Sequence, residues 1–345
     1  MKSFKIVPAI AEYSDFAAFA KEINLGPTDL ILTNEYIYEP TIAALNLGCH
    51  TCFQEKFGGG TIIDIAKVLA VADSTDNVDS LYDNMSGLRK VHKLFIVPTT
   101  CGTGSEVTNI SIINRTTKGV KVGLVSPTMF ANEAVLIPAM LNSLPYPVFA
   151  TSSIDAMVHA VESYLSPNAC ALSELFSEKA LHLILSCWKD AVQKGGKDAW
   201  KEHALEFLRA SNYAGIAFGH AGCAAVHAMA YPLGGVHHIP HGQANQLMFA
   251  DVMRKYQQKK PVGKINQLEE LLAAELGTQP VFALNALYEL MDDVLKKAPL
   301  REHGVTEDGL PAFAKSVIET QQRLLGNNYV ELTEEDLLNI YQKAF

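Results

Sequence analysis

Short apolar runs alternate with helical patterns along roughly the first 140 residues of this chain. The runs that predict strands are rich in Val, Ile and Leu, are bounded by Gly, Pro, Asp or Asn, and cover residues 30–33, 94–97, 120–125 and 134–137. The apolar positions of residues 62–69 keep helical spacing in a segment that opens at Gly60 and Thr61. Strands that alternate with helices predict an α/β domain with a mostly parallel sheet.

From Pro145 onward the pattern changes to long helical patterns with hardly a strand signal among them. The clearest of these patterns cover residues 177–192, 204–218, 265–276 and 281–295. Two prolines in the sequence LNSLPYP, residues 141–147, interrupt the pattern and mark the expected domain boundary. We therefore expect an α/β domain over residues 1–142 and an all-α domain over residues 143–345.

The composition limits the classes of molecule that we expect this protein to bind. The 345 residues are 48% hydrophobic and 19% charged, which is typical of a globular protein with large cores. The net charge of −9 comes without a basic block, so a nucleic acid or an anionic membrane surface is not an expected partner. The sequence contains no apolar run of about 18 residues and no signal-peptide pattern at its start, and we therefore expect a cytoplasmic protein that acts on small molecules.

A glycine turn is the first candidate for chemistry. Gly58, Gly59 and Gly60 precede Thr61 and a predicted helix, and a turn without side chains lets backbone N–H groups approach a phosphate at the helix start. The segment is neither a GxGxxG fingerprint nor a P-loop, because Lys67 lies too far along and no Ser or Thr follows it. An ordinary turn is the alternative interpretation.

A second polar loop follows the predicted strand at residues 94–97. Its sequence, PTTCGTGSE, places hydroxyls and exposed amides at the carboxyl end of a strand, where open α/β sheets bind ligands. Thr99, Thr100, Thr103 and Ser105 are therefore candidates for hydrogen bonds to phosphate or ribose oxygens. The same composition is also typical of a loop without a ligand.

Metal-ligand residues gather in two segments of the helical half. Asp155 and His159 are spaced i and i+4 in TSSIDAMVHAVESY, so they share one helix face, and Glu162 lies three residues further on. The second segment, GCAAVHAMAYPLGGVHHIPHGQAN, contains His227, Tyr231, His237, His238 and His241. One carboxylate and three neutral imidazoles suit Fe²⁺ or Zn²⁺. Any single histidine here also fits a buried core residue, and His237 and His238 also fit surface positions.

Together these segments resemble the iron-dependent alcohol dehydrogenase family over nearly the whole chain. GGGTIIDIAK is similar to the family's pyrophosphate-binding turn, PTTCGTGSEVTN to its second nucleotide loop, and DAMVH and HAMAYPLGGVHHIPHG to its metal segments. The metal set implied by the resemblance is Asp155, His159, His227 and His241, for Fe²⁺ or Zn²⁺. The NAD-binding residues implied by it are Gly58, Gly59, Gly60, Thr61, Asp64, Thr99, Thr100, Thr103, Ser105, Thr108 and Lys121.

Two positions depart from the family pattern. Tyr231 stands where most members have a second histidine, four residues after the third ligand, so we expect Tyr231, with His237, to be the catalytic candidates. The Tyr231 hydroxyl either delivers a proton or only shapes the pocket. Asn34 stands where many members have an aspartate that disfavours a 2′-phosphate, which leaves both NAD and NADP open.

The largest departure is a missing segment. Family members have a crossover helix and a hydrophobic strand before the glycine turn, whereas Gly58 here follows CHTCFQEKF directly. A crossover with its strand takes on the order of 25 residues, so one βα unit is absent at the 57/58 join. Either the printed sequence omits these residues or the protein has lost a central strand. The first interpretation is favoured, because a glycine turn without a strand to position it makes a poor phosphate site.

The resemblance implies an NAD(P)-dependent oxidoreductase that interconverts a primary alcohol and an aldehyde, as a homodimer or larger homo-oligomer. Segments such as ILTNEYIYEP and VIETQQRLLGNNY are most similar to members that act on 4-hydroxybutyrate and succinate semialdehyde. A carboxylate at the far end of that substrate needs a cationic partner, for which Arg323 and Arg301 are candidates. The alternatives are a glycerol-type polyol dehydrogenase, or a metal-binding protein without catalysis if the nucleotide domain is truly truncated.

Overall fold

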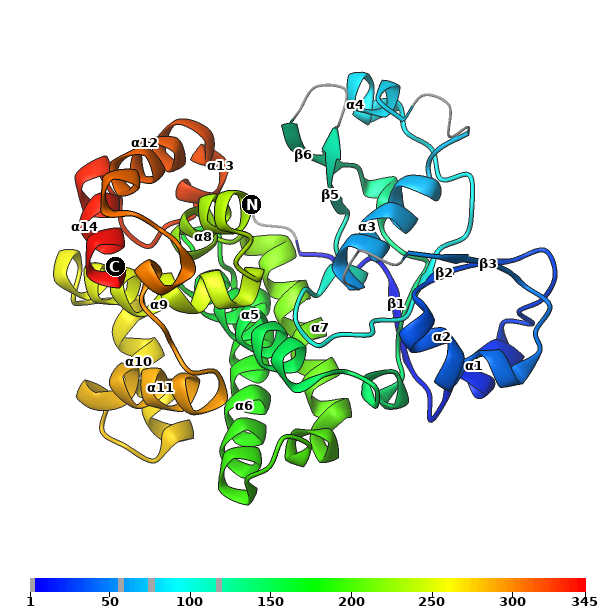
Figure 1. Ribbon diagram of the computed structural model, residues 1–345, viewed down its shortest axis with the longest axis horizontal. Coiled ribbons are helices and arrows are strands. Elements are labelled where there is room, and N and C mark those ends of the chain that lie inside the picture. Colours follow the sequence, from blue (N-terminus) through cyan, green and yellow to red (C-terminus); the bar gives the residue numbers. More distant parts are fainter. Residues whose placement is uncertain (1–3, 55–58, 74–77, 116–119) are drawn as a thin grey trace. The chain divides into compact units, whose positions relative to one another are not determined.

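A computed structural model describes residues 4–54, 59–73, 78–115 and 120–345, with the side chains of all of these except residues 114, 115 and 120–122. The chain divides into two compact units, one comprising Lys5–Pro145 and the other Tyr146–Phe345 together with Phe4 (Figure 1). The first unit combines helices with a mostly parallel set of strands, and the second is helical, which confirms the predicted fold class.

The first unit contains short elements. Its strands are β1 (Ala9–Glu12), β2 (Leu30–Thr33), β3 (His50–Phe53), β4 (Phe95–Ile96), β5 (Ile110–Arg115), β6 (Val120–Val125) and β7 (Glu133–Leu136). Its helices are α1 (Phe16–Glu22), α2 (Glu35–Thr41), α3 (Gly59–Leu69) and α4 (Ser80–Asp83). The four predicted strands correspond to β2, β4, β6 and β7, whereas β1, β3 and β5 were not predicted, because short strands with mixed polarity have no strong period.

The described parallel strands form two sheets instead of one. One sheet has the order β1-β7-β4 and the other pairs β2 with β3, both with parallel neighbours. The predicted strand at 120–125 is not part of either, because β6 pairs antiparallel with β5, with Ile112 opposite Gly123. The last described strand before α3 is β3, which belongs to the β2-β3 pair and not to the sheet that contains β4.

Helices α1 and α2 cover the β7 strand with an aromatic and aliphatic core. Phe16 and Phe19 of α1 and Ile37 of α2 are buried in one cluster with Val135 of β7. The rings of Phe16 and Phe19 meet edge to face at 5.6 Å. Burial of such side chains contributes about 1.5–3 kcal/mol each, which holds this part of the unit together without a longer sheet.

The second unit consists of long helices and a few short ones. They are α5 (Tyr146–Leu165), α6 (Ala171–Lys194), α7 (Ala204–Ala221), α8 (Ala225–His237), α9 (His241–Lys259), α10 (Lys264–Leu276), α11 (Pro280–Val294), α12 (Leu310–Thr320), α13 (Gln322–Leu325) and α14 (Glu334–Ala344). The four predicted helical patterns correspond to α6, α7, α10 and α11. Helix α5 lies in the middle of this unit, in contact with α6, α7, α9 and α10 (Figure 1).

Aromatic side chains pack against α5 in the centre of the helical unit. The rings of Phe149 and Trp200 stack at 4.1 Å, and the indole N–H of Trp188 donates to Ser153 Oγ at 3.0 Å. A buried indole therefore has its required hydrogen-bond partner.

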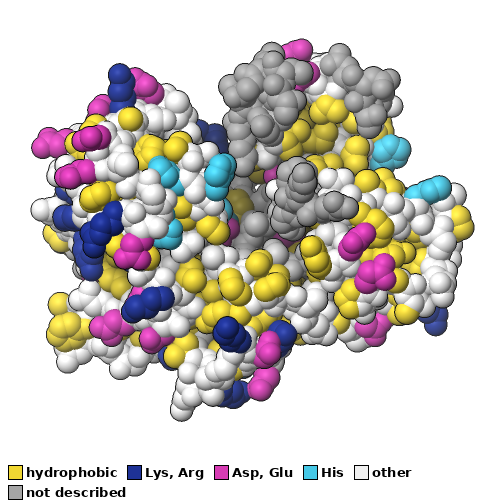
Figure 2. Space-filling view, viewed as in Figure 1, with side chains coloured by type: hydrophobic (Ala, Val, Ile, Leu, Met, Phe, Trp, Pro, Cys, Tyr) yellow, Lys and Arg dark blue, Asp and Glu magenta, His cyan; other side chains and the backbone are white. Residues whose placement is uncertain are grey.

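No helix in the described part of the chain is long and apolar enough to cross a membrane. On the face shown in Figure 2, Lys and Arg side chains are interspersed with Asp and Glu rather than gathered by sign.

Candidate metal centre and cofactor loop

Helix α5 supplies two of the predicted metal ligands from its buried face. Asp155 and His159 are one helical turn apart, and both are buried. His159 Nε2 lies 3.9 Å from Asp155 Oδ1. The surrounding residues of α5 include Ala156 and Ala160, whose small side chains let neighbouring helices approach. The i, i+4 spacing therefore has the predicted structural effect of bringing both side chains to one place.

Helices α8 and α9 bring two more imidazoles to the same carboxylate oxygen. His227 is in the first turn of α8, and His241 is the first residue of α9. Their Nε2 atoms lie 3.4 Å and 3.5 Å from Asp155 Oδ1. The four residues predicted to bind the metal are thus brought together, and their role as ligands stays a prediction.

The spacing of these donors suits a small divalent cation. Four ligands about 2.0–2.2 Å from an ion lie about 3.3–3.6 Å from one another in a tetrahedron. The distances from Asp155 Oδ1 to His227 and His241 match this range, and His159 lies slightly farther away at 3.9 Å. The amide of Asn245 lies among them, with Nδ2 2.7 Å from Asp155 Oδ1, while its Oδ1 is buried without a hydrogen-bond partner among the described residues. A buried polar atom without a partner indicates that a group other than a protein side chain completes the site. The donor set therefore fits Fe²⁺ or Zn²⁺.

Glu162 orients the His227 ring through a contact with its Nδ1 atom. Its Oε2 lies 2.6 Å from His227 Nδ1, and its two oxygens accept from the backbone N–H groups of Ala224 and Val226 at 2.9 Å and 2.6 Å. The carboxylate thus caps the start of α8 and holds the Nδ1 side of the ring, which leaves Nε2 facing Asp155. The helical spacing in the sequence marked Glu162 as a possible ligand but did not predict this role.

Two carboxylates set the charge of the donor set. Burial disfavours the imidazolium, but the nearby Glu162 and Asp155 carboxylates outweigh it and raise the pKa of His227 to about 9. Burial opposes the ionised form of Asp155, yet His159, His241 and His227 hold the pKa of its carboxyl well below its usual range. An incoming cation therefore meets an ionised carboxylate and must displace a proton from His227.

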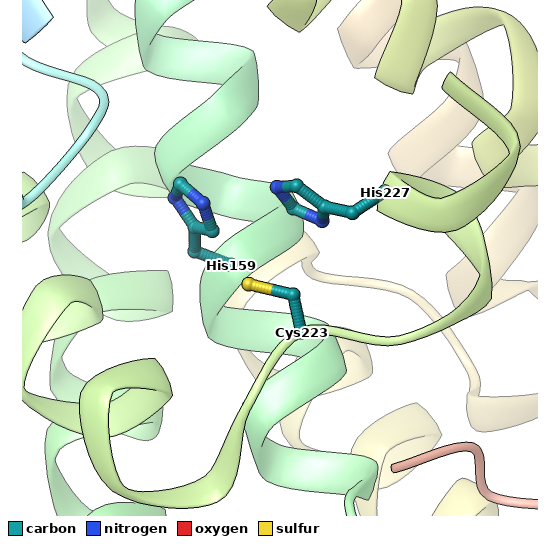
Figure 3. Close-up of side chains that lie close together, drawn as sticks. All are labelled: His159, Cys223 and His227. Atoms are coloured by element: carbon teal, nitrogen blue, oxygen red, sulfur yellow. The ribbon is translucent and has the colours of Figure 1, made fainter. Parts of the chain in front are cut away.

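A thiol forms a second group of donors with two of the same histidines. The donor atoms of His159, Cys223 and His227 lie within 4.8 Å of one another, with the sulfur close to both stacked rings (Figure 3). Burial, with Glu162 and Asp155 nearby, raises the pKa of the Cys223 thiol well above its usual value, so the sulfur stays protonated. A protonated thiol is a poor metal ligand, whereas the Asp155 carboxylate is ionised, so the group around Asp155 is the better metal site.

The two predicted catalytic residues are placed differently. The ring of Tyr231 lies 6.0 Å from that of His241, beside the metal donors, and burial raises the pKa of its hydroxyl. His237 is the last residue of α8, and its ring meets Phe313 edge to face at 5.7 Å. The structure therefore places Tyr231 beside a predicted ligand, whereas the described ring contact of His237 is with Phe313.

In the first unit, the glycine turn and the threonine loop lie against each other. A Cβ at Gly59 would be 3.0 Å from Thr99 Oγ1, and one at Gly60 would be 3.1 Å from Thr103 Cγ2. Thr100 also lies within van der Waals range of Gly59, and Thr61 is in the first turn of α3. Two segments about 40 residues apart thus form one polar surface, as the prediction of a shared phosphate site requires.

Behind that surface, Lys67 of α3 is buried and hydrogen-bonded to the loop. Its Nζ donates to Ser105 Oγ at 2.7 Å, to Thr108 Oγ1 at 2.9 Å and to the carbonyl of Ile110 at 2.9 Å. Asp64 accepts from Ser105 Oγ at 3.2 Å and from the Ile112 N–H at 2.9 Å. The side chains of Asp64, Ser105 and Thr108, which were predicted to bind the cofactor, thus take part in a network inside the protein.

Three further residues singled out in the sequence have different outcomes. Gly58 lies outside the described residues, and for Lys121 only the backbone, in β6, is described. Asn34 caps α2, where its Oδ1 accepts from the Ile37 N–H at 3.1 Å. An asparagine at this position is explained by the helix cap alone.

Close contact between α5 and α9 predicts a strong effect of one methyl group. A Cβ at Gly242, next to His241, would lie 1.8 Å from the backbone oxygen of Thr151. Gly242→Ala should therefore push the helices apart and destabilise the protein by about 3 kcal/mol or more, measured by urea denaturation. Gly235→Ala on α8 is the matched control, because nothing lies within 4 Å of its added Cβ. Equal stability of the two variants would contradict the described packing.

Comparison with known families covers both units. Residues 149–345 match the family model of the C-terminal part of Fe-containing alcohol dehydrogenases, and residues 27–138 match the model of iron-containing alcohol dehydrogenases. The chain belongs to the iron-containing alcohol dehydrogenase family. The resemblance seen in the sequence motifs is thereby confirmed.

Two relatives show how similar the chain is to other members of this alcohol dehydrogenase family. The chain is 42% identical over 373 positions to a 4-hydroxybutyrate dehydrogenase of Clostridium kluyveri, covering all of both chains. It is 31% identical over 304 positions to lactaldehyde reductase of Escherichia coli, covering 84% of this chain and 75% of that protein. Because the first alignment has 373 positions and this chain has 345 residues, at least 28 positions have no counterpart here. That is about the size expected for the missing βα unit.

Solved structures share the fold of this family member. A 1,3-propanediol oxidoreductase superposes with a TM-score of 0.83 at 22% identity, covering all of both chains. A sulfoacetaldehyde reductase from Bifidobacterium kashiwanohense, solved in complex with NAD⁺, gives a TM-score of 0.83 at 20% identity and covers 100% of this chain and 98% of that one. At these identities the likeness shows the fold.

Proposed function

We propose that this alcohol dehydrogenase interconverts 4-hydroxybutyrate and succinate semialdehyde with NAD or NADP, using Fe²⁺ or Zn²⁺ at the Asp155 site. The observation that carries the proposal is the convergence of Asp155, His159, His227 and His241 in a chain that is 42% identical to a 4-hydroxybutyrate dehydrogenase along its full length. When bound, the metal polarises the alcohol or aldehyde oxygen, and the nicotinamide accepts or delivers the hydride.

The protein's own residues prepare the site for this reaction. Asp155 supplies the negative charge, while the Asn245 amide donates a hydrogen bond to its Oδ1. Glu162 holds the Nδ1 side of His227, so the lone pair of Nε2 is directed toward the other donors. Asp155 and His227 are buried, which strengthens the electrostatic interactions between them, whereas 45% of the His241 side chain is exposed.

Tyr231 acts in this proposal as a hydrogen-bond donor. Burial raises the pKa of its hydroxyl, so the proton stays on the oxygen at neutral pH and the residue is not a base. Its place beside His241 supports contact with the substrate oxygen. Tyr231→Phe should lower kcat by about 10-fold with little change in metal content, because it removes a hydrogen bond and no metal donor. An unchanged kcat would limit Tyr231 to shaping the pocket.

A substrate panel tests the proposed reaction. Succinate semialdehyde should have a kcat/KM at least about 10-fold above that of butanal, and 4-hydroxybutyrate should be oxidised in preference to 1-butanol and glycerol, with NAD⁺ and NADP⁺ each tried. The expected preference arises because a paired carboxylate contributes binding that a methyl group lacks. Preference for glycerol would instead favour the polyol dehydrogenase.

A metal-binding protein without catalysis is the second candidate, because the last described strand before α3 lies outside the sheet that contains β4. Titration with NADH, followed by its fluorescence, separates the two candidates. We expect saturable binding, and its absence would support the non-catalytic protein. The intact mass of the purified chain belongs beside this measurement, since a value clearly above 37.6 kDa would show that the printed sequence lacks a segment.

A further inference from the structure

A single peptide unit connects the backbone before α8 to the Glu162 carboxylate. Cys223 and Ala224 form the segment that enters α8, the helix that carries His227 (Figure 3). The N–H of Ala224 donates at 2.9 Å to Glu162 Oε2, and the same oxygen lies 2.6 Å from His227 Nδ1. The orientation of this peptide therefore affects the carboxylate that holds the His227 ring.

The other end of this peptide is held by Asn327, two residues after α13. Asn327 Nδ2 donates to the carbonyl of Cys223 at 2.9 Å and to the carbonyl of Arg323, within α13, at 3.2 Å. No peptide bond among the described residues is cis, so the Cys223 carbonyl and the Ala224 N–H point in opposite directions from one rigid plane. Asn327 and Glu162 therefore hold the same peptide from its two ends.

The Asn327 amide has a defined orientation in a space that a glycine provides. Two backbone carbonyls can only accept, so the amide atom that faces them is the nitrogen. The amide oxygen, Oδ1, accepts from Asn168 Nδ2 at 2.8 Å. Gly222 has a φ of +82°, in the left-handed region that favours glycine, and a Cβ there would lie 2.2 Å from Asn327 Nδ2. The close approach of the amide to the loop thus depends on Gly222.

We propose that Asn327 is a positioning residue for the metal centre, acting through this peptide and the Glu162 carboxylate on the His227 ring. This inference rests on the proposed function, because it names the residue that supports one ligand of the proposed metal. The hydrogen bond from Asn327 keeps the Ala224 N–H directed at Glu162 Oε2 and polarises the peptide, which makes that N–H a stronger donor. Without it, the Cys223 carbonyl loses this donor, and Glu162 is held less firmly against the ring.

Titration of the purified protein with Zn²⁺, after removal of its metal and in competition with a chromophoric chelator, tests this role. Asn327→Ala should raise the Kd for Zn²⁺ about 10-fold, the lower end of the effect of groups that orient a ligand directly. Asn327→Asp has the same shape but no N–H to donate, so it should also weaken binding, although its negative charge by itself favours a cation. Gly222→Ala, which displaces the amide, is a further variant if Asn327→Ala does not fold.

The matched control removes the other hydrogen bond of the same amide. Asn168→Ala deletes the donor to Asn327 Oδ1 and leaves the hydrogen bond to Cys223 in place, so the Kd for Zn²⁺ should stay within about 2-fold of the parent. Urea denaturation of each variant shows that it is folded under the conditions of the titration. A residue with only a structural role would lower the free energy of unfolding and leave the Kd for Zn²⁺ unchanged.

A double-mutant cycle with Glu162→Gln tests the route of the effect. The carboxylate that connects the peptide to His227 is absent from this variant, so adding Asn327→Ala should change its Kd by less than about 2-fold. A 10-fold change in both backgrounds, or a parental Kd in Asn327→Ala and Asn327→Asp, would overturn the role of Asn327 and leave the metal centre standing. If the parent protein itself binds no Zn²⁺, the metal centre of the proposed function is overturned, and the inference falls with it.

Discussion

His227→Ala should lose its metal and its turnover together. The substitution removes one of four donors and leaves the Glu162 carboxylate buried without the ring that it contacts at 2.6 Å. We expect the affinity for Fe²⁺ or Zn²⁺ to fall by at least about 100-fold, since changes to groups that only orient a ligand already cost about 10- to 100-fold. Metal content by mass spectrometry and turnover with NAD⁺ measure the two effects separately.

The control for this prediction is another histidine of the helical unit. His182 of α6 is half exposed and pairs with Glu275 at 2.9 Å, away from the metal donors, so His182→Ala should keep both metal and turnover. Far-UV circular dichroism of both variants distinguishes loss of metal from loss of fold. A His227→Ala protein with full metal content and full activity would overturn the assignment of the metal centre.

Lys67→Met should weaken NADH binding by about 10-fold or more and destabilise the protein by about 3 kcal/mol. The substitution leaves Ser105 Oγ, Thr108 Oγ1 and the Ile110 carbonyl without their shared donor, inside a buried network that also contains Asp64. Of the hydrogen bonds described above between the loop that faces the glycine turn and α3, only the one from Ser105 Oγ to Asp64 would then remain. Fluorescence titration with NADH and urea denaturation measure the two effects, and Lys21→Met, an exposed lysine of α1, is the control.

The lowered pKa of Lys67 predicts how the free energy of unfolding changes with pH. Burial lowers the pKa of Lys67 to about 8, although Asp64 and Glu106 oppose this, whereas its ordinary value is 10.5. Between these values the unfolded chain binds more protons than the folded one, so the contribution of Lys67 to stability rises with pH from about 8 to 10.5. The difference in free energy of unfolding between the parent and Lys67→Met should therefore grow over this range. A constant difference would contradict the lowered pKa.

Much of the metal centre was predictable because helical spacing is local. Asp155 and His159 are four residues apart, and any α-helix over that segment places them on one face. Asn245 is four residues after His241, so the same spacing could have identified it as well. Glu162 was noticed by spacing alone, but its contact with His227 joins residues 65 apart, and no local pattern determines such a contact.

In the first unit, the sequence predicted less of the tertiary structure. The sequence indicated that hydroxyl residues follow a strand, but Asp64, Ser105 and Thr108 turn toward Lys67, because a buried ammonium requires several acceptors. The strand pattern at 120–125 was correct in its bounds, and only pairing with β5 made it antiparallel. A strand's own residues do not determine which neighbour it meets.

By itself, the sequence determined the α/β and helical halves, the residue types of the metal centre and the family, since these depend on periodicity and on motifs a few residues long. Only the tertiary structure decided which oxygen the three imidazoles share and which carboxylate holds His227. Those outcomes depend on contacts between helices far apart in the chain, and such contacts form only when the buried faces of the helices come together.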